Sequence, residues 1–123
     1  MSDLFIFADS EVRAVQPQAG GLCVAFSAAQ VQRDGETGYL QGLEWVFDDA
    51  IWSGELNAAF GRLREAHVWL GGARTACLTL PGPWTGPVRA ELQFGNGTLV
   101  AVQAAALHCR NAGQARFQLS LAC

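Results

Sequence analysis

The clearest pattern of hydrophobic and polar positions lies in residues 88–106 and predicts a strand, a glycine-rich turn and a second strand. Apolar and polar residues alternate over the first strand, which is typical of a strand with one buried and one solvated face. The apolar positions are Val88, Ala90, Leu92 and Phe94. The turn is Gly95-Asn96-Gly97, where glycine and asparagine tolerate the positive φ that tight hairpins need.

The length of this turn decides which residues face each other. A two-residue turn at Asn96-Gly97 would leave Val100 and Val102 on the solvated face. A three-residue turn instead places both valines opposite apolar residues of the first strand, namely Leu92 and Ala90, and residues opposite each other share a face. We therefore predict a three-residue loop, built as a type I turn closed by a glycine bulge.

Similar patterns predict further short strands at residues 4–8, 22–27, 43–47, 66–70, 76–80 and 117–123. Residues 12–15 either continue the first strand after a kink near Asp9-Ser10 or pair with it. Gly71-Gly72 predicts the turn of a second hairpin, which joins residues 66–70 to residues 76–80. Asp48-Asp49 interrupts an apolar run that resumes at residues 50–52, so we expect a turn or bulge at the two aspartates.

Proline, glycine and polar residues mark the connections between these strands. Residues 16–21 contain one proline and two glycines and predict a turn. Residues 30–42 form the most polar segment and predict a loop. Residues 81–87 contain three prolines, which cannot donate to a strand ladder, so we expect a rigid crossover there.

One segment, residues 55–63, has a helical pattern. Its apolar residues fall at i, i+3, i+4 and i+7, the stripe of an amphipathic helix. They are Leu56, Ala59, Phe60 and Leu63. Ser53 is suited to cap this helix and Glu55 to occupy its first turn, whereas Gly61 in its interior costs about 1 kcal/mol. We predict a short helix here, with a pair of short strands as the alternative.

These elements predict a single all-β domain over residues 1–123, mostly antiparallel. About eight short strands separated by glycine and proline turns indicate a small β-sandwich or barrel, with residues 55–63 as its one short helix. The chain is 50% hydrophobic and 15% charged, which is unlike a disordered segment. Its 123 residues suffice to bury a core without disulfide bonds.

Charge is unevenly distributed along the chain. The net charge of −3 argues against a general nucleic-acid-binding protein. Residues 1–60 hold nine acidic residues and two arginines, a net of −7, whereas residues 61–123 have a net of +4. This asymmetry would favour head-to-tail or two-fold self-association, unless strands from the two halves interleave in space and average it out.

The N-terminal residues and the cysteines indicate a compartment. Residues 1–11 have no basic leader and an apolar run of only five residues, so we expect neither a signal peptide nor a membrane span. A cytoplasmic protein with reduced thiols follows. The metal-binding residue types are widely spaced and form no CxxC pair, so we expect no metal site. They are Cys23, Cys77, Cys109, Cys123, His67 and His108.

Motifs for catalysis are weak. The chain has neither a G-x-S-x-G elbow nor a phosphate-binding glycine loop, and we expect no cofactor. A cysteine–histidine nucleophile is compatible with the sequence, although nothing singles out one pair. Glycosidases combine two acids with aromatic platforms, and Asp48 and Asp49 lie near Trp45 and Trp52. A solvated hairpin turn explains the same two aspartates.

The four tryptophans are the best candidates for binding, because large aromatic residues dominate recognition sites as well as cores. Trp45 shares its parity with apolar neighbours and is expected in the core. Trp69 alternates with Val68 and Leu70 and is expected to face outward. Trp84 lies in the proline-rich segment, where it either contacts a partner together with Trp52 or packs under its own loop.

We therefore predict a small cytoplasmic binding or accessory protein that acts through protein–protein contact or self-association, with a homodimer expected from its weakly charged strand edges. It would bind neither nucleic acid nor membrane and would catalyse no reaction. The candidate binding residues are Trp84, Trp52, Trp69, Asp48 and Asp49. Two alternatives remain: a small-molecule or carbohydrate-binding barrel with tryptophans around an internal cavity, and a hydrolase built on Asp48, Asp49 and Glu55.

Overall fold

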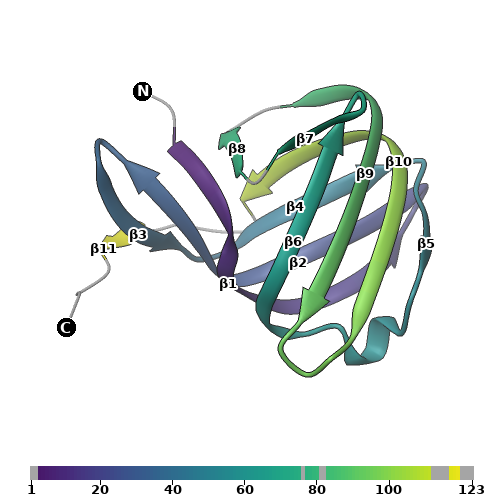
Figure 1. Ribbon diagram of the computed structural model, residues 1–123, viewed down its shortest axis with the longest axis horizontal. Helices are drawn as coiled ribbons and strands as arrows, with labels where there is room; N and C mark the ends of the chain where they lie inside the picture. Colours follow the sequence, from purple (N-terminus) through teal and green to yellow (C-terminus); the bar gives the residue numbers. More distant parts are fainter. Residues whose placement is uncertain (1–2, 76, 81–82, 112–116, 120–123) are drawn as a thin grey trace.

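A computed structural model describes residues 3–75, 77–80, 83–111 and 117–119. Almost all of them belong to antiparallel strands (Figure 1), which confirms the predicted all-β fold. The strands are β1 (Asp3–Gln18), β2 (Gly21–Arg33), β3 (Glu36–Leu40), β4 (Leu43–Asp48), β5 (Ile51–Ser53), β6 (Gly61–Leu70), β7 (Ala73–Thr75), β8 (Cys77–Leu80), β9 (Trp84–Phe94), β10 (Leu99–Asn111) and β11 (Phe117–Leu119).

Six strands close into a barrel in the order β1, β2, β4, β10, β9 and β6. The ring closes where β1 meets β6, with Glu11 opposite Arg62 and Val12 opposite Gly61. The other strands attach outside this ring: β3 to β2, β5 to β10, β7 to β6, β8 to β1 and β11 to β3. Full closure removes free edges from the six ring strands along their paired lengths.

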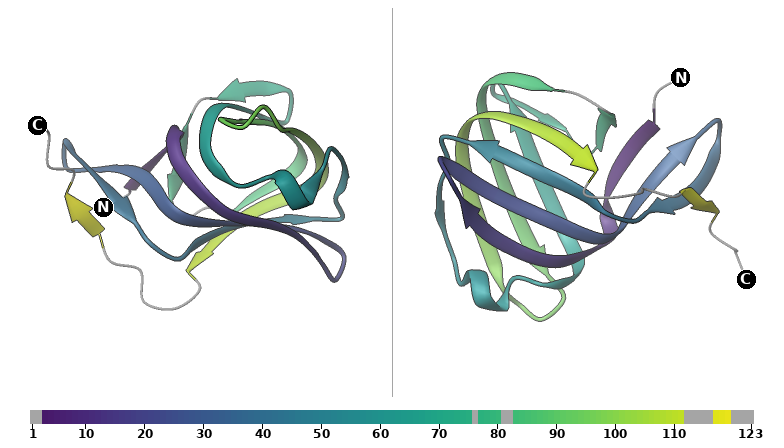
Figure 2. Two further views of the ribbon diagram at one scale, coloured as in Figure 1. Left: turned by 90° about the horizontal axis from the view of Figure 1, so that it is seen from below. Right: turned by 180° about the vertical axis from the view of Figure 1, so that it is seen from behind.

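The ring divides into two arcs that follow the two halves of the chain. Strands β1, β2 and β4 come from residues 1–60, and β6, β9 and β10 come from residues 61–123. The first arc forms the far wall in Figure 1 and the near wall in the right-hand view of Figure 2. The halves therefore do not interleave around the ring, and ion pairs join the two arcs: Asp9 with Arg62 and Glu44 with Arg110.

The hairpin of β9 and β10 has the predicted register. Leu92 lies opposite Val100, and Ala90 lies opposite Val102. The N–H of Gly97 donates to the carbonyl of Phe94 (3.0 Å), and Gly97 has a φ of +91°. These features confirm a three-residue turn closed by a glycine in the left-handed region.

Aromatic side chains fill the barrel interior. Trp45 is fully buried, as predicted, and its ring contacts four phenylalanine rings at centroid distances of 5.1–5.9 Å. These are Phe5, Phe7, Phe26 and Phe47. Mostly edge-to-face contacts of this kind stabilise a core beyond the burial of apolar area.

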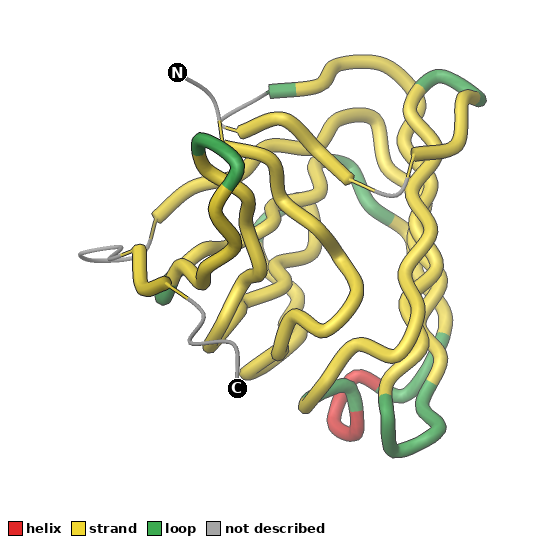
Figure 3. The backbone as a smooth tube through the Cα atoms, turned by 60° about the vertical axis from the view of Figure 1, so that its left-hand side comes forward, coloured by secondary structure: helices red, strands yellow, loops and turns green. Residues whose placement is uncertain are grey.

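The helix predicted over residues 55–63 is wrong. Only a three-residue 3₁₀ turn forms, at Leu56–Ala58, preceded by Glu55 and without a side-chain cap (Figure 3). Gly61 has a φ of +93° and begins β6, and Leu63 is buried opposite Phe94. Pairing with β1 and β9 therefore outweighs the helical stripe, as tertiary context commonly does. In the described residues, no helix is long or apolar enough to cross a membrane.

Two predicted connections are shorter than expected. The polar segment 30–42 is not a loop, because β2 continues to Arg33 and β3 returns after a two-residue turn at Asp34-Gly35. Both turn residues have positive φ, as a tight hairpin requires. Its polar side chains lie on both strands of this hairpin, where they alternate with buried residues such as Val31 of β2 and Leu40 of β3. The turn predicted at residues 16–21 likewise narrows to residues 19–20.

The proline-rich segment also enters the sheet, against prediction. Strand β9 begins at Trp84, and Gly86-Pro87 forms a bulge where the β9–β10 register shifts near Ala105. Gly86 has a φ of +100°, and at a bulge the missing N–H of Pro87 breaks no regular ladder bond. Residues 81–82 lie outside the described residues.

The second predicted hairpin is only partly correct. The turn at Gly71-Gly72 is confirmed, and β7 returns along β6 with Ala73 opposite Leu70. Strand β8, however, leaves this hairpin and pairs with β1 instead. The predicted kink near Asp9-Ser10 is also confirmed, because β1 continues through a register shift there, with Asp9 at a φ of +67°. At the C-terminal end, residues 117–119 pair with β3, and residues 120–123 lie outside the described residues.

Ser10 stabilises the register shift of β1 near Asp9 with two hydrogen bonds. It is fully buried, its Oγ donates to the carbonyl of Ile6 (2.9 Å), and the N–H of Gln30 donates to its Oγ (2.9 Å). We expect Ser10→Ala to lower the free energy of unfolding by about 2 kcal/mol, because the N–H of Gln30 would lose its acceptor in a buried site. Urea denaturation followed by circular dichroism measures this loss.

Ser27 provides the matched control. Its Oγ also donates to a backbone carbonyl, that of Glu11 (3.3 Å), but Ser27 is exposed to solvent. Water can replace that bond, so Ser27→Ala is expected to change the free energy of unfolding by less than about 0.5 kcal/mol. Equal losses from the two substitutions would show that the bridge made by Ser10 carries no special weight.

Candidate functional site

Five neighbouring strands present a row of outward side chains. Figure 1 shows β6, β9, β10 and β5 side by side, and β7 pairs with β6. Across them, Gln103 lies opposite both Ile51 and Arg89, Arg89 lies opposite Trp69, and Trp69 lies opposite Arg74 of β7. We call the surface made by these five residues the Gln103 face.

An arginine–tryptophan pair lies at the centre of the Gln103 face. The guanidinium carbon of Arg89 lies 4.9 Å from the ring centroid of Trp69, within cation–π range. The same guanidinium donates to Glu91 (2.9 Å). Arg89 is thus held over the sheet by two neighbours, while its other N–H groups stay available as donors.

A second arginine contacts the neighbouring histidine. Arg74 Nη2 lies 2.7 Å from His67 Nδ1, and because a guanidinium can only donate, Nδ1 accepts this hydrogen bond. The other ring nitrogen of His67 is Nε2. That nitrogen lies 3.8 Å from a carboxylate oxygen of Glu65. Arg74, His67 and Glu65 therefore place cationic, aromatic and acidic groups next to one another on this side of the Gln103 face.

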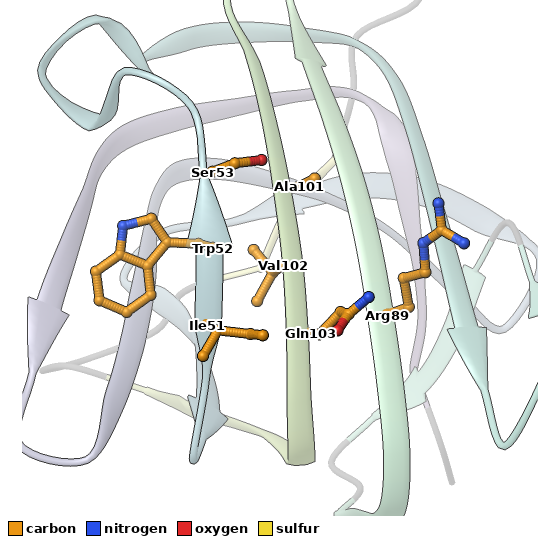
Figure 4. A pocket seen from close by; sticks show the side chains of 7 residues that line it. All are labelled: Ile51, Trp52, Ser53, Arg89, Ala101, Val102 and Gln103. Atoms are coloured by element: carbon orange, nitrogen blue, oxygen red, sulfur yellow. The ribbon is translucent and has the colours of Figure 1, made fainter.

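Three adjoining hollows lie along the Gln103 face, and Gln103 forms part of the lining of each one. A hollow of about 280 Å³ lies between β5 and β9, with Ile51 and Arg89 on its two sides; Trp52 also lines it, but its indole points away from Arg89 (Figure 4). A hollow of about 520 Å³ lies beside Trp69. A third, of about 460 Å³, reaches Asp49. Small residues line these hollows: Gly72, Gly86, Ala101, Ala104 and Ala105. Among the described residues, the side-chain amide of Gln103 has no hydrogen-bond partner, so it is free to bind a ligand or partner.

The structure brings together three of the five predicted site residues. Trp52, Trp69 and Asp49 each line one of the three hollows. Trp84 is not in an exposed loop: it lies half-buried in β9 opposite Leu107 and packs against the core. Asp48 lies apart from the hollows and pairs with His108 (3.5 Å).

The three acids that suggested a hydrolase lie in a turn, at the end of a strand and just before the 3₁₀ turn. Asp49 has a φ of +51°, and its N–H donates to the carbonyl of Gly20 (2.6 Å), which fits the predicted turn. Asp48 ends β4 and is exposed, and exposed Glu55 precedes the 3₁₀ turn. Within the described ranges, no group of three or more histidine, cysteine or acidic side chains is arranged to hold a metal ion.

Two of the cysteines have surroundings that suppress thiol reactivity. Burial raises the pKa of the Cys109 thiol to about 12. Burial, and after it the carboxylate of Glu44, also raises the pKa of Cys23. A thiol with a raised pKa is a poor nucleophile at neutral pH. Cys123 lies outside the described residues.

Sequence reasoning did not identify Arg89 and Gln103. The predicted hairpin register contained a signal for this pair, because setting Ala90 opposite Val102 also sets Arg89 opposite Gln103 on the solvated face. The approach of Trp69 to Arg89 needs the pairing of β6 with β9. No local sequence pattern indicates that β6 pairs with β9.

No protein-family model, curated protein or solved structure matches this chain.

Proposed function

We propose that this protein acts by binding a protein partner on the Gln103 face and catalyses no reaction. The observation that carries the proposal is the sharing of Gln103 by three adjoining hollows, two of which are lined by Arg89 and one of these also by Trp69. Tryptophan and arginine are the residue types that most often supply the binding energy of protein interfaces.

Exposed apolar surface beside the hollows supports this proposal. Ile51 is 68% exposed and lies opposite Gln103, on the outer side of the sheet, whereas Trp52 lies opposite the buried Val102 and faces the other side. Removing a side chain such as Ile51 from water is worth about 2 kcal/mol. Burial of Ile51 against a partner would therefore add to the binding energy.

The edge of β5 adds a second attachment. Among the described strands, β5 pairs only with β10, so its other edge is unpaired. An unpaired edge offers backbone donors and acceptors to another chain. The hollows also lie on the outside of the sheet, where a protein surface can reach them.

A photo-cross-linking residue tests this proposal. Benzoylphenylalanine placed at position 103 is expected to give a cross-linked product on irradiation in the native cell, because this position is central to the Gln103 face. Gln32 is the matched control, since it is also an exposed glutamine in an antiparallel strand. Gel electrophoresis and mass spectrometry detect and identify the products. Equal labelling from both positions, or no product from position 103, would refute the proposal.

A further inference from the structure

We propose that the partner on the Gln103 face is a second copy of this chain, related to the first by a two-fold axis. The inference rests on the proposed function and specifies the partner. A two-fold interface is self-complementary: when residue i of one copy meets residue j of the other, the reverse contact forms as well. The Gln103 face must therefore carry matched groups on either side of a centre.

Asp49 and Arg89 are such a matched pair. Strands β4 and β5 follow β10 in one continuous register, with Asp48 opposite Ala106 and Ile51 opposite Gln103. Asp49 therefore lies on one side of β10, and Arg89 lies on the other side, in β9. Each of them lines a hollow that Gln103 also lines. Both side chains are exposed.

A two-fold axis near Gln103 would place Asp49 of each copy against Arg89 of the other. Two identical ion pairs result, and Arg89 has N–H groups left for them after its bond to Glu91. The same axis carries the exposed Ile51 of each copy over the small residues of the other, such as Ala101. Charge and shape are both complementary in this arrangement.

The charges at the boundary of the two arcs favour a second copy over an unrelated partner. The Gln103 face lies where the arc from residues 1–60 meets the arc from residues 61–123, because β5 follows β4 while β10 and β9 belong to the second half. Asp49 comes from the first half and Arg89 from the second, and both are exposed at this boundary. A two-fold axis there brings each of them toward the opposite charge of the other copy, which favours association at moderate ionic strength.

Charge reversal on each side gives the sharpest test. Asp49→Arg and Arg89→Asp should each weaken dimerisation by about tenfold or more, because like charges would then meet twice across the axis. An equimolar mixture of the two variants should dimerise again, because both contacts then join an arginine to an aspartate. Sedimentation velocity at micromolar concentrations measures the dimer in each sample.

Two further variants separate charge from folding. Asp49→Asn removes the charge and keeps a residue that tolerates positive φ, so it should weaken the dimer without straining the turn. Glu36→Arg reverses an exposed acid in β3, away from the Gln103 face, and should leave the dimer unchanged. Circular dichroism shows that each variant remains folded.

The outcomes separate this inference from the proposed function. A wild-type chain that stays monomeric at all concentrations overturns the two-fold dimer, and cross-linking of another protein from position 103 would then leave the proposed function standing. A dimer that neither reversal weakens, or a mixture that does not recover, also overturns the inference, since the contact would lie elsewhere. Restored dimerisation only in the mixture supports it.

Discussion

Replacing Trp45 with alanine is expected to lower the free energy of unfolding by about 4 kcal/mol, the largest loss we expect from a single side-chain truncation. The side chain is 0% exposed and contacts four phenylalanine rings inside the barrel. Its removal would leave a cavity that rigid strands cannot collapse to fill. Urea denaturation followed by circular dichroism in the far ultraviolet measures the change.

Two variants bracket this prediction. Trp45→Phe should cost less, about 1–2 kcal/mol, because a ring remains and the indole Nε1 of Trp45 has no hydrogen-bond acceptor among the described residues. Trp52→Ala should cost less than about 1 kcal/mol, because Trp52 lies exposed on β5. A loss at position 45 no larger than that at position 52 would show that the barrel interior tolerates a void.

Gly21→Ala is expected to lower the free energy of unfolding by about 3 kcal/mol. A Cβ atom at Gly21 would lie 2.0 Å from the carbonyl oxygen of Phe47, and a backbone atom within a sheet cannot move aside cheaply. Strands β2 and β4 would have to separate at Gly21 and Asp48, where their pairing begins. The midpoint of urea denaturation reports the loss.

The neighbouring glycine gives a control within the same turn. Gly20 has a φ of +75°, and a Cβ atom there would meet no atom within 4 Å. Gly20→Ala should therefore cost only about 1 kcal/mol, from backbone conformation alone. If Gly20→Ala were as costly as Gly21→Ala, the close approach of β2 to β4 could not be the cause.

The elements that were predictable from sequence are those determined by neighbouring residues. The turn at Gly95-Asn96-Gly97 and the register of its strands follow from alternation and glycine conformation within about twenty residues. The burial of Trp45 followed from parity in the same way. In each of these cases local preference and the final fold agree, as minimally frustrated sequences require.

The elements that were not predictable depend on distant strands. The apolar stripe at residues 55–63 is compatible with a helix, but Gly61 pairs with β1 and Leu63 pairs with β9. Pro87 enters β9 because Gly86 allows a bulge opposite β10. Local sequence cannot report such partners, and they decide the conformation in both cases.

The candidate site shows the same division. Trp52 and Trp69 were identifiable by residue type, Trp69 also by its expected outward face, and the pairing of Arg89 with Gln103 was implicit in the hairpin register. Their assembly into one surface was not predictable, because it requires β5 to extend β4 along β10 and β6 to pair with β9. Trp84 misled the prediction for the same reason as Pro87, since both lie in the segment taken for a loop.

The narrow contact that closes the ring has a consequence for the order in which the barrel forms. Strands β1 and β6 have a ladder of two residue pairs, which join positions 11 and 12 to positions 62 and 61, and one side-chain ion pair between Asp9 and Arg62. The intervening chain of roughly fifty residues must lose much of its freedom before this contact can form, and two pairs return little in exchange. The β9–β10 hairpin, with its short turn, has no such barrier. We therefore expect the β1–β6 contact to form late during folding and to open first during local unfolding of the barrel.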